Sequence, residues 1–343
     1  MGPVTWRQLV ARFGDAAAAI EALPMLARRG GGKPPRVPDA AEVSREADRA
    51  ARLGARYLFL DDPDYPSPLA ELESAPPALF LRGDLALTRR PCVAIVGARN
   101  ASAAACRFAR QLGHDLGDAG ATVVSGLARG IDTAAHKGAL GGGTVGVIAS
   151  GVDVVFPPEN AELQERVATE GLLLTEHPPG TEPRARNFPA RNRIIAGLSQ
   201  GTVVVEAAPK SGSLITARLA GEAGREVMAV PGSPLDPRAQ GCNLLIRDGA
   251  TLVQSAADVL ELIRPIDPRA VRSPAVRYAA QSPEDADDDT RRAVTDLLGP
   301  VPVPVDELIR QSARPPAVVQ MVLLELELAG RVERHAGGRV SLA

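Results

Sequence analysis

The feature that most constrains the fold of this chain is the alternation of short apolar runs with amphipathic or alanine-rich stretches between residues 92 and 263. The apolar runs are rich in β-branched residues and have no polar face, which is typical of strands covered on both sides. Strands of this kind separated by helices predict an α/β domain with a Rossmann-like, doubly wound and mostly parallel sheet. The predicted strands are 92–96, 122–124, 144–148, 172–174, 202–205, 226–230 and 251–253, and the clearest helices are 101–119, 159–170 and 213–223.

Changes of composition divide the chain into four segments. The first is predicted to be a small helical domain with a connecting segment, and the second is the sheet domain. The third is rich in Pro, Ser, Arg and Asp, which is typical of a linker, and the fourth combines three helices with a β-hairpin in the manner of a winged helix. The predicted boundaries are 1–84, 85–264, 265–289 and 290–343.

The N-terminal segment is predicted to hold helices at 5–21 and 39–53, with a break rich in glycine and proline at 28–35. Gly31-Gly32-Lys33 resembles the end of a phosphate-binding loop. The first glycine of that motif is missing, and Pro34 stands where it needs Ser or Thr. We therefore interpret 28–35 as a flexible, solvated turn.

The longest predicted helix of the C-terminal segment, 315–329, corresponds to the helix that enters the DNA groove in a winged helix. It contains Glu325 and Glu327 and has no lysine or arginine, so it is expected to repel phosphates. This composition favours a protein–protein or regulatory role over groove reading.

Overall charge and cysteine usage exclude several classes of function. With 39 Lys and Arg against 41 Asp and Glu the net charge is −2, so any nucleic-acid site has to be a local patch. Cys92, Cys106 and Cys242 are scattered, with no CxxC pair and no clustered histidines, so we expect neither a metal nor another cofactor. This cysteine usage, together with the lack of a signal-peptide or bilayer-spanning pattern, predicts a soluble cytoplasmic protein.

The loop after the first strand of the predicted sheet is a candidate anion site, because ligands of such sheets bind at the carboxyl ends of the strands. Small residues from Gly97 to Ser102 would let main-chain N–H groups approach an anion at the start of the next helix. Arg99 could hold a phosphate through two N–H donors. It also replaces the second glycine of the dinucleotide fingerprint, which favours a phosphodiester over NAD. A merely tight strand-to-helix turn accounts equally for these residues.

A second glycine-containing loop follows the next strand and supplies Ser125, Gly126 and Arg129. Asp132 and His136 lie one helical turn apart just beyond it, a spacing that suits acid–base chemistry. No nucleophile is nearby in the sequence, and Asp132 is well placed to cap the helix, so we assign structural roles to both residues.

The most informative segment is 184–197, in which four arginines and one aromatic residue occur without any acidic residue. Phe188 stands between these arginines ahead of a helix that Pro189 can start. A base stacked on a ring with cations on both sides is how single-stranded nucleic acid is held without sequence preference. The alternative is that Phe188 fills the core and the arginines pair with acids elsewhere. The candidate DNA-binding residues are Gly97, Arg99, Ser102, Ser125, Gly126, Arg129, Arg184, Arg186, Phe188, Arg191, Asn192 and Arg193.

These motifs, taken in order, resemble the DNA-processing protein A family (DprA, also called Smf). The resemblance runs through five motifs and covers the central domain almost entirely; Ala98 stands where the family usually has Ser, a small change. The motifs are Gly97-Ala98-Arg99 and the segments 125–132, 188–197, 211–217 and 229–232.

The resemblance implies a protein that binds and protects single-stranded DNA and loads the RecA recombinase on it during natural transformation. It also implies a homodimer formed through the Rossmann-like domain and no catalytic activity.

Two other functions remain open from the sequence. Gly201-Thr202 ahead of Glu206 is similar to part of a motif in nucleotide phosphoribohydrolases, although the spacing is one residue longer and the preceding glycines are missing. A regulator that binds DNA through its winged helix is disfavoured by the acidic helix.

Overall fold

The computed structural model describes residues 2–33, 35–263, 286–335 and 337–343. The chain forms two compact units, residues 40–272 and residues 1–39 together with 273–343. Most of the predicted linker at 265–289 lies outside the described residues. Among the described helices, none combines the length and the apolar character needed to cross a lipid bilayer.

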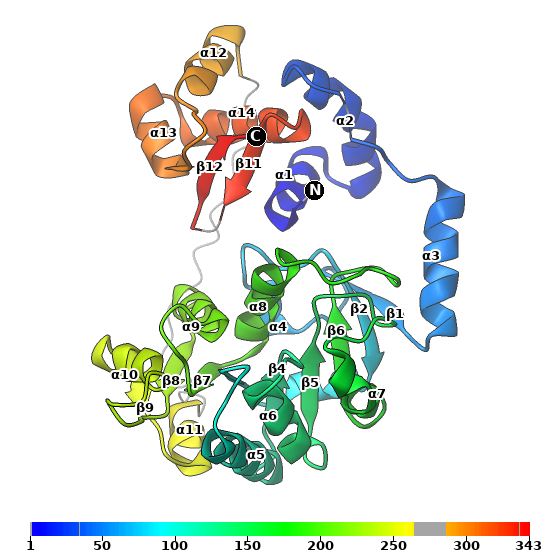
Figure 1. Cartoon of the computed structure of the whole chain (residues 1–343). Helices are drawn as coiled ribbons and strands as arrows, with labels where there is room; N and C mark the ends of the chain where they lie inside the picture. The colour runs from blue at the N-terminus through cyan, green and yellow to red at the C-terminus, as the bar shows by residue number, and fades with distance from the viewer. Residues whose placement is uncertain (1, 34, 264–285, 336) are drawn as a thin grey trace, which may run out of the picture. The chain divides into compact units, whose positions relative to one another are not determined.

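The larger unit is built on a nine-stranded sheet with the order β1-β2-β6-β5-β4-β3-β7-β8-β9 (Figure 1). The seven strands from β6 to β9 in this order pair in parallel, and β2 joins β6 antiparallel. This confirms the doubly wound, mostly parallel sheet, and all seven predicted strands are present. Their bounds are β3 Cys92–Gly97, β4 Thr122–Ser125, β5 Thr144–Val147, β6 Leu172–Thr175, β7 Gly201–Val205, β8 Glu226–Ala229 and β9 Thr251–Leu252.

The sheet differs from the prediction at its first edge. Strands β1 (Arg56–Phe59) and β2 (Ala78–Gly83) form an antiparallel pair and extend the sheet beyond β6. The predicted boundary at residue 84 had placed both in the N-terminal helical domain and its connection. The segment between them holds only the four-residue helix α4 (Ser67–Ala70), so the strand–helix alternation that revealed the other strands is missing here.

Helices cover both faces of the sheet. Strand β3 shows how, because Val93 and Ile95 point to one face and Ala94 and Val96 to the other, all of them buried. Each of these valine and isoleucine side chains stabilises the fold by roughly 1.5–3 kcal/mol when it is removed from water. The Val93 face packs against α5 (Ala103–Asp118), α6 (Ile131–Ala139) and α11 (Ala256–Ile263), and the other face against α4, α8 (Asn187–Leu198), α9 (Gly212–Glu222) and α10 (Gln240–Arg247). Helices α3 (Ala40–Arg52) and α7 (Ala161–Glu170) pack around Phe80 and Leu173.

The smaller unit joins the two ends of the chain. Its N-terminal part is α1 (Pro3–Phe13) and α2 (Ala16–Arg29), where a single helix had been predicted at 5–21. Gly14 ends α1 with a φ of 88°, and the Asp15 carboxylate accepts the Ala18 N–H at the start of α2. Its C-terminal part is the predicted winged helix, with α12 Asp288–Asp296, β10 Val303–Pro304, α13 Val305–Ser312, α14 Pro316–Leu328, β11 Val332–His335 and β12 Arg339–Leu342.

Helix α14 belongs to two cores. One side packs within the winged helix, and the other, through Met321, Leu324 and Leu328, packs against leucines of α1 and α2. Glu325 is 1% exposed and accepts hydrogen bonds from Arg291, while Glu327 accepts from Thr5 and Arg334. The two glutamates are therefore neutralised inside the unit, and the expected repulsion of phosphates does not describe their role.

The glycine-rich segment that follows α2 packs closely against α14. A Cβ added at Gly30 would lie 2.1 Å from the carbonyl oxygen of Glu325, and one at Gly32 would lie 2.2 Å from that of Ala329. The flexible, solvated turn predicted at 28–35 is thus wrong at Gly30, which is buried.

We expect Gly30→Ala to destabilise the smaller unit by about 1–3 kcal/mol, because backbone atoms of α14 cannot move aside cheaply for the new methyl group. The free energy of unfolding from urea titration measures the effect. Gly299→Ala is the matched control in the same unit, since a Cβ there meets nothing within 4 Å. Equal stability of the two variants would show that α2 is not held against α14.

Candidate nucleic-acid interface

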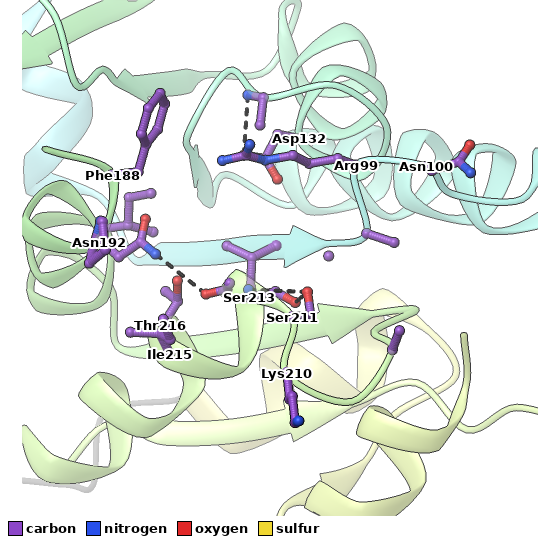
Figure 2. A pocket seen from close by; sticks show the side chains of 18 of the residues that line it. Arg99, Asn100, Asp132, Phe188, Asn192, Lys210, Ser211, Ser213, Ile215 and Thr216 are labelled. Carbon is purple, nitrogen blue, oxygen red and sulfur yellow. Dashed lines mark hydrogen bonds between the residues drawn. The ribbon is translucent and has the colours of Figure 1, made fainter. Parts of the chain in front are cut away.

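A large cavity of the sheet unit lies where the chain order of the sheet reverses. Strand β3 has β4 on one side and β7 on the other, so the loops that leave β3 and β7 diverge at the carboxyl edge. A cavity of about 790 Å³ lies between these loops, within the size range of small-ligand sites. Figure 2 shows Phe188 and Arg99 in the upper part of this cavity and Ser213, Ser211 and Lys210 below them.

Arg191 and Asp132 form the floor of the cavity and are 4% and 7% exposed. The Arg191 guanidinium donates to the carbonyl oxygen of Val147 at 2.9 Å, at the end of β5, and lies directly on Gly126. Burial lowers the pKa of Arg191 to about 10, against the opposing effect of Asp132, so the side chain remains charged at neutral pH. Arg191 was predicted to bind DNA; its position is that of a buried cation beneath the cavity.

Asp132 holds the loop after β4. Its Oδ2 accepts the N–H groups of Gly126 at 3.1 Å and Ala128 at 3.3 Å. Burial raises the pKa of Asp132, and Arg191 together with the two N–H donors opposes that rise. His136, one turn later, is buried against Thr144 and burial lowers its pKa to about 3. These contacts support a structural role for both residues, but the expected capping of α6 by Asp132 is wrong, because its carboxylate binds N–H groups of the preceding loop and α6 has no side-chain cap.

The anion at the N-terminus of α5 is a carboxylate of the protein itself, whereas the sequence predicted a DNA phosphate there. The Glu206 carboxylate accepts the Ser102 N–H at 2.7 Å, and the Ser102 hydroxyl accepts the Ala105 N–H. Gly97 is needed for packing, because a Cβ would lie 2.0 Å from the Val205 carbonyl oxygen. Ser102 is therefore engaged in capping, and Arg99 is the exposed cation of this loop.

The residues predicted from the second loop also have partners within the protein. The Ser125 hydroxyl is buried and donates to the Ile95 carbonyl at 2.7 Å. Gly126 accommodates Arg191, whose Nη1 would lie 1.6 Å from an added Cβ. Arg129 is exposed and forms an ion pair with Glu159.

The four arginines of the segment 184–197 have different environments. Arg184 and Arg186 are exposed, ahead of α8. Arg191 is buried, and Arg193 forms a largely buried ion pair with Glu176, as the structural alternative had it. Asn192 reaches across to the Gly212 carbonyl at 3.4 Å, beside the start of α9.

Phe188 is half-buried and borders the cavity. The Arg99 guanidinium lies over its ring, with Cζ 5.2 Å from the centroid, and the Phe156 ring lies 5.5 Å away at an interplanar angle of 55°. Phe188 is in none of the buried clusters of the described residues. The arrangement is that of an accessible aromatic surface with a cation beside it.

The candidate residues predicted from the sequence did not include the loop after β7 or the loop after β5. Lys210, Ser211 and Ser213 line the large cavity at the start of α9, and Phe156 contacts Phe188. The rule that led to Gly97–Ser102, applied to the strand ending at Val205, would have found the first group. Phe156 has no basic neighbours, so the pattern that singled out Phe188 did not include it.

Comparison with known protein families gives three matches along the chain. Residues 1–49 match a DprA-like N-terminal HHH domain, residues 56–264 match DNA recombination-mediator protein A, and residues 279–338 match the DprA winged helix domain.

Individual relatives agree with these matches. The chain is 37% identical over 316 residues to Protein Smf of Synechocystis sp., covering 83% of this chain and 79% of that protein. The X-ray structure of DNA processing protein A from Streptococcus pneumoniae is 44% identical, with a TM-score of 0.62 over 65% of this chain and 78% of the other. DNA processing protein A from Helicobacter pylori, described for its single-stranded DNA binding mode, is 30% identical, with a TM-score of 0.55 over 60% and 94%.

Proposed function

The chain belongs to the DNA recombination-mediator protein A family (DprA/Smf), and from this premise we propose that its sheet domain binds single-stranded DNA. The observation that carries the proposal is the accessible Phe188 ring with the Arg99 guanidinium over it, at the edge of the large cavity. An unpaired base can stack on the ring, while the arginine contacts the sugar–phosphate backbone. Duplex DNA offers no free base to this surface.

Positive charge around the cavity supports backbone contacts in a chain whose net charge is −2. Arg99, Lys210 and the pair Arg184 and Arg186 are exposed on segments that border or lead into the cavity. We assign DNA contact to these residues, to Phe188 and to Asn192. Gly97, Ser102, Ser125, Gly126, Arg191 and Arg193 act mainly by shaping the loops that present them.

The enzymatic alternative has weaker support. Gly201 and Thr202 are buried within β7, and the Glu206 carboxylate caps α5 and lies 3.9 Å from Arg238. A glutamate held in this way is poorly placed to attack or protonate a nucleotide.

Binding of oligo-dT should be strand-selective and salt-sensitive, with a log–log slope of about −0.7 for each phosphate neutralised. Arg99→Ala should weaken binding and make the slope shallower by about that amount, with little change in thermal stability. Arg89→Ala is the control, because Arg89 is exposed and forms a surface ion pair with the exposed Asp64. Equal affinity for duplex and single strand, or release of free base from a nucleoside monophosphate, would contradict the proposal.

Phe188→Ala should weaken oligo-dT binding about five- to hundredfold, the effect of one lost stacked base at roughly 1–3 kcal/mol, whereas Phe188→Trp should retain binding. The free energy of unfolding should change little, because the ring is only half-buried. Phe80→Ala provides the contrast of a core ring, 4% exposed, and should cost about 3–5 kcal/mol of stability. A Phe188→Ala variant as unstable as Phe80→Ala would place Phe188 in a structural role.

We further propose that the protein protects single-stranded DNA in the cytoplasm, loads RecA recombinase on it during DNA uptake, and acts as a homodimer. Family membership supports these roles, and the three free cysteines suit a reducing compartment.

The dimer surface is proposed at the edge strand β9. Three leucines in the segment that ends at this strand are exposed and would be covered by a second copy: Leu235, Leu244 and Leu252, at 93%, 44% and 46%. Sedimentation equilibrium with Leu244→Glu tests the dimer. A wild-type monomer at micromolar concentration, or RecA filaments that form on single-stranded DNA no faster with the protein than without it, would contradict these roles.

A further inference from the structure

A second, smaller cavity adjoins the first near Phe188. Its volume is about 380 Å³, and it shares five lining residues with the larger cavity: Arg99, Asn100, Ala128, Phe188 and Arg191. Its own boundary comes from the loop after β5, where Phe156, Pro157 and Pro158 supply an apolar wall. Phe188 and Arg99 thus border two adjacent cavities, and the function proposed above uses only one.

Phe156 has the properties of a ligand-contacting ring. It is 42% exposed, so much of its ring is available to a ligand. Its ring lies 5.5 Å from that of Phe188, tilted by 55°, so the two rings do not cover each other face to face. Either ring could therefore stack on one face of a planar ligand in the smaller cavity, which both rings line.

The charges around this cavity suit a nucleic-acid strand. Of the described residues that line it, three are arginines (Arg99, Arg129 and Arg191) and none is acidic, although Glu159 pairs with Arg129. Arg191 is 4% exposed, and among the described residues its Nε has no hydrogen-bond partner. Apolar walls over a buried cation favour a planar, polar-edged group such as a nucleobase over a bare phosphate.

We propose that the smaller cavity binds a second nucleobase, adjacent in the strand to the base held in the larger cavity. Phe188 with Arg99 then separates two consecutive bases that have been unstacked from each other. The inference rests on the proposed function and deepens it from a single stacked base to a two-base site. Recognition is tolerant of base identity, because the wall formed by Phe156, Pro157 and Pro158 carries no side-chain hydrogen-bonding group.

Short oligonucleotides with an otherwise abasic backbone test this directly, because all of them carry the same phosphate charge. The first has one thymine, the second has two adjacent thymines, and the third has two thymines separated by three abasic residues. The wild-type protein should bind the adjacent pair about five- to hundredfold more tightly than the single thymine. The separated pair should gain only the roughly twofold statistical factor expected for two equivalent ligands.

Phe156→Ala should abolish the advantage of the adjacent pair and leave affinity for the single thymine nearly unchanged, whereas Phe156→Tyr should keep both. Phe59→Ala is the matched control, since Phe59 is a 51% exposed ring of the same unit at strand β1. No advantage of adjacent over separated thymines in the wild-type protein would overturn the two-base site. So would a Phe156→Ala variant that weakens the single-thymine and adjacent-pair ligands equally. Failure of the proposed function looks different, because none of the ligands, nor oligo-dT, would then bind.

Discussion

The geometry of the candidate site depends on the burial of one cation, Arg191. Its guanidinium contacts Gly126 after β4 and the Val147 carbonyl at the end of β5, and the buried charge of Asp132 stabilises it from α6. One side chain of α8 thereby fixes the position of that helix against two strand ends. Phe188 lies three residues earlier in α8, so the same contact directs its ring to the cavity. Removal of either buried charge would take away part of the electrostatic stabilisation of the other, which would keep its own hydrogen bonds to main-chain groups.

The loops at this edge are held by contacts within the protein that imitate ligand binding. Glu206 supplies the anion at the start of α5, and Asp132 supplies one for the N–H groups of Gly126 and Ala128. Leu127, Glu206 and Lys210 adopt φ values of 54°, 58° and 65°, a region that is unfavourable for side chains with a Cβ. Strained conformations of this kind persist where the surroundings determine them and are concentrated at functional sites. Because these N–H groups are bound within the protein, the exposed cations at this edge, Arg99 and Lys210, can contact an external ligand.

The sequence predicted the parallel part of the fold well, because alternation of apolar strands and helices is a local signal. It failed for β1 and β2, which pair antiparallel without a long helix between them, and for Gly30, whose role depends on a helix some three hundred residues away. Arg99 and Phe188, which were predicted from composition and loop position, both line the large cavity, and their contact with DNA stays a prediction. The ion pair of Arg193 with Glu176 could not be predicted from the sequence, because Glu176 belongs to another segment and only the fold brings the two side chains together.

Helix α14 shows how a correct observation can lead to an incomplete interpretation. The two glutamates and the lack of lysine and arginine at 315–329 predict a surface that repels phosphates. The more informative property is that the helix is apolar except for Gln320, Glu325 and Glu327, which is expected of a helix buried on most of its sides. Met321, Leu324 and Leu328 meet α1 and α2, while Val319, Val322, Leu323 and Leu326 fill the winged helix. From Val319 onward α14 is therefore held largely in internal contacts, whereas Pro316 and Ala317 at its start are exposed.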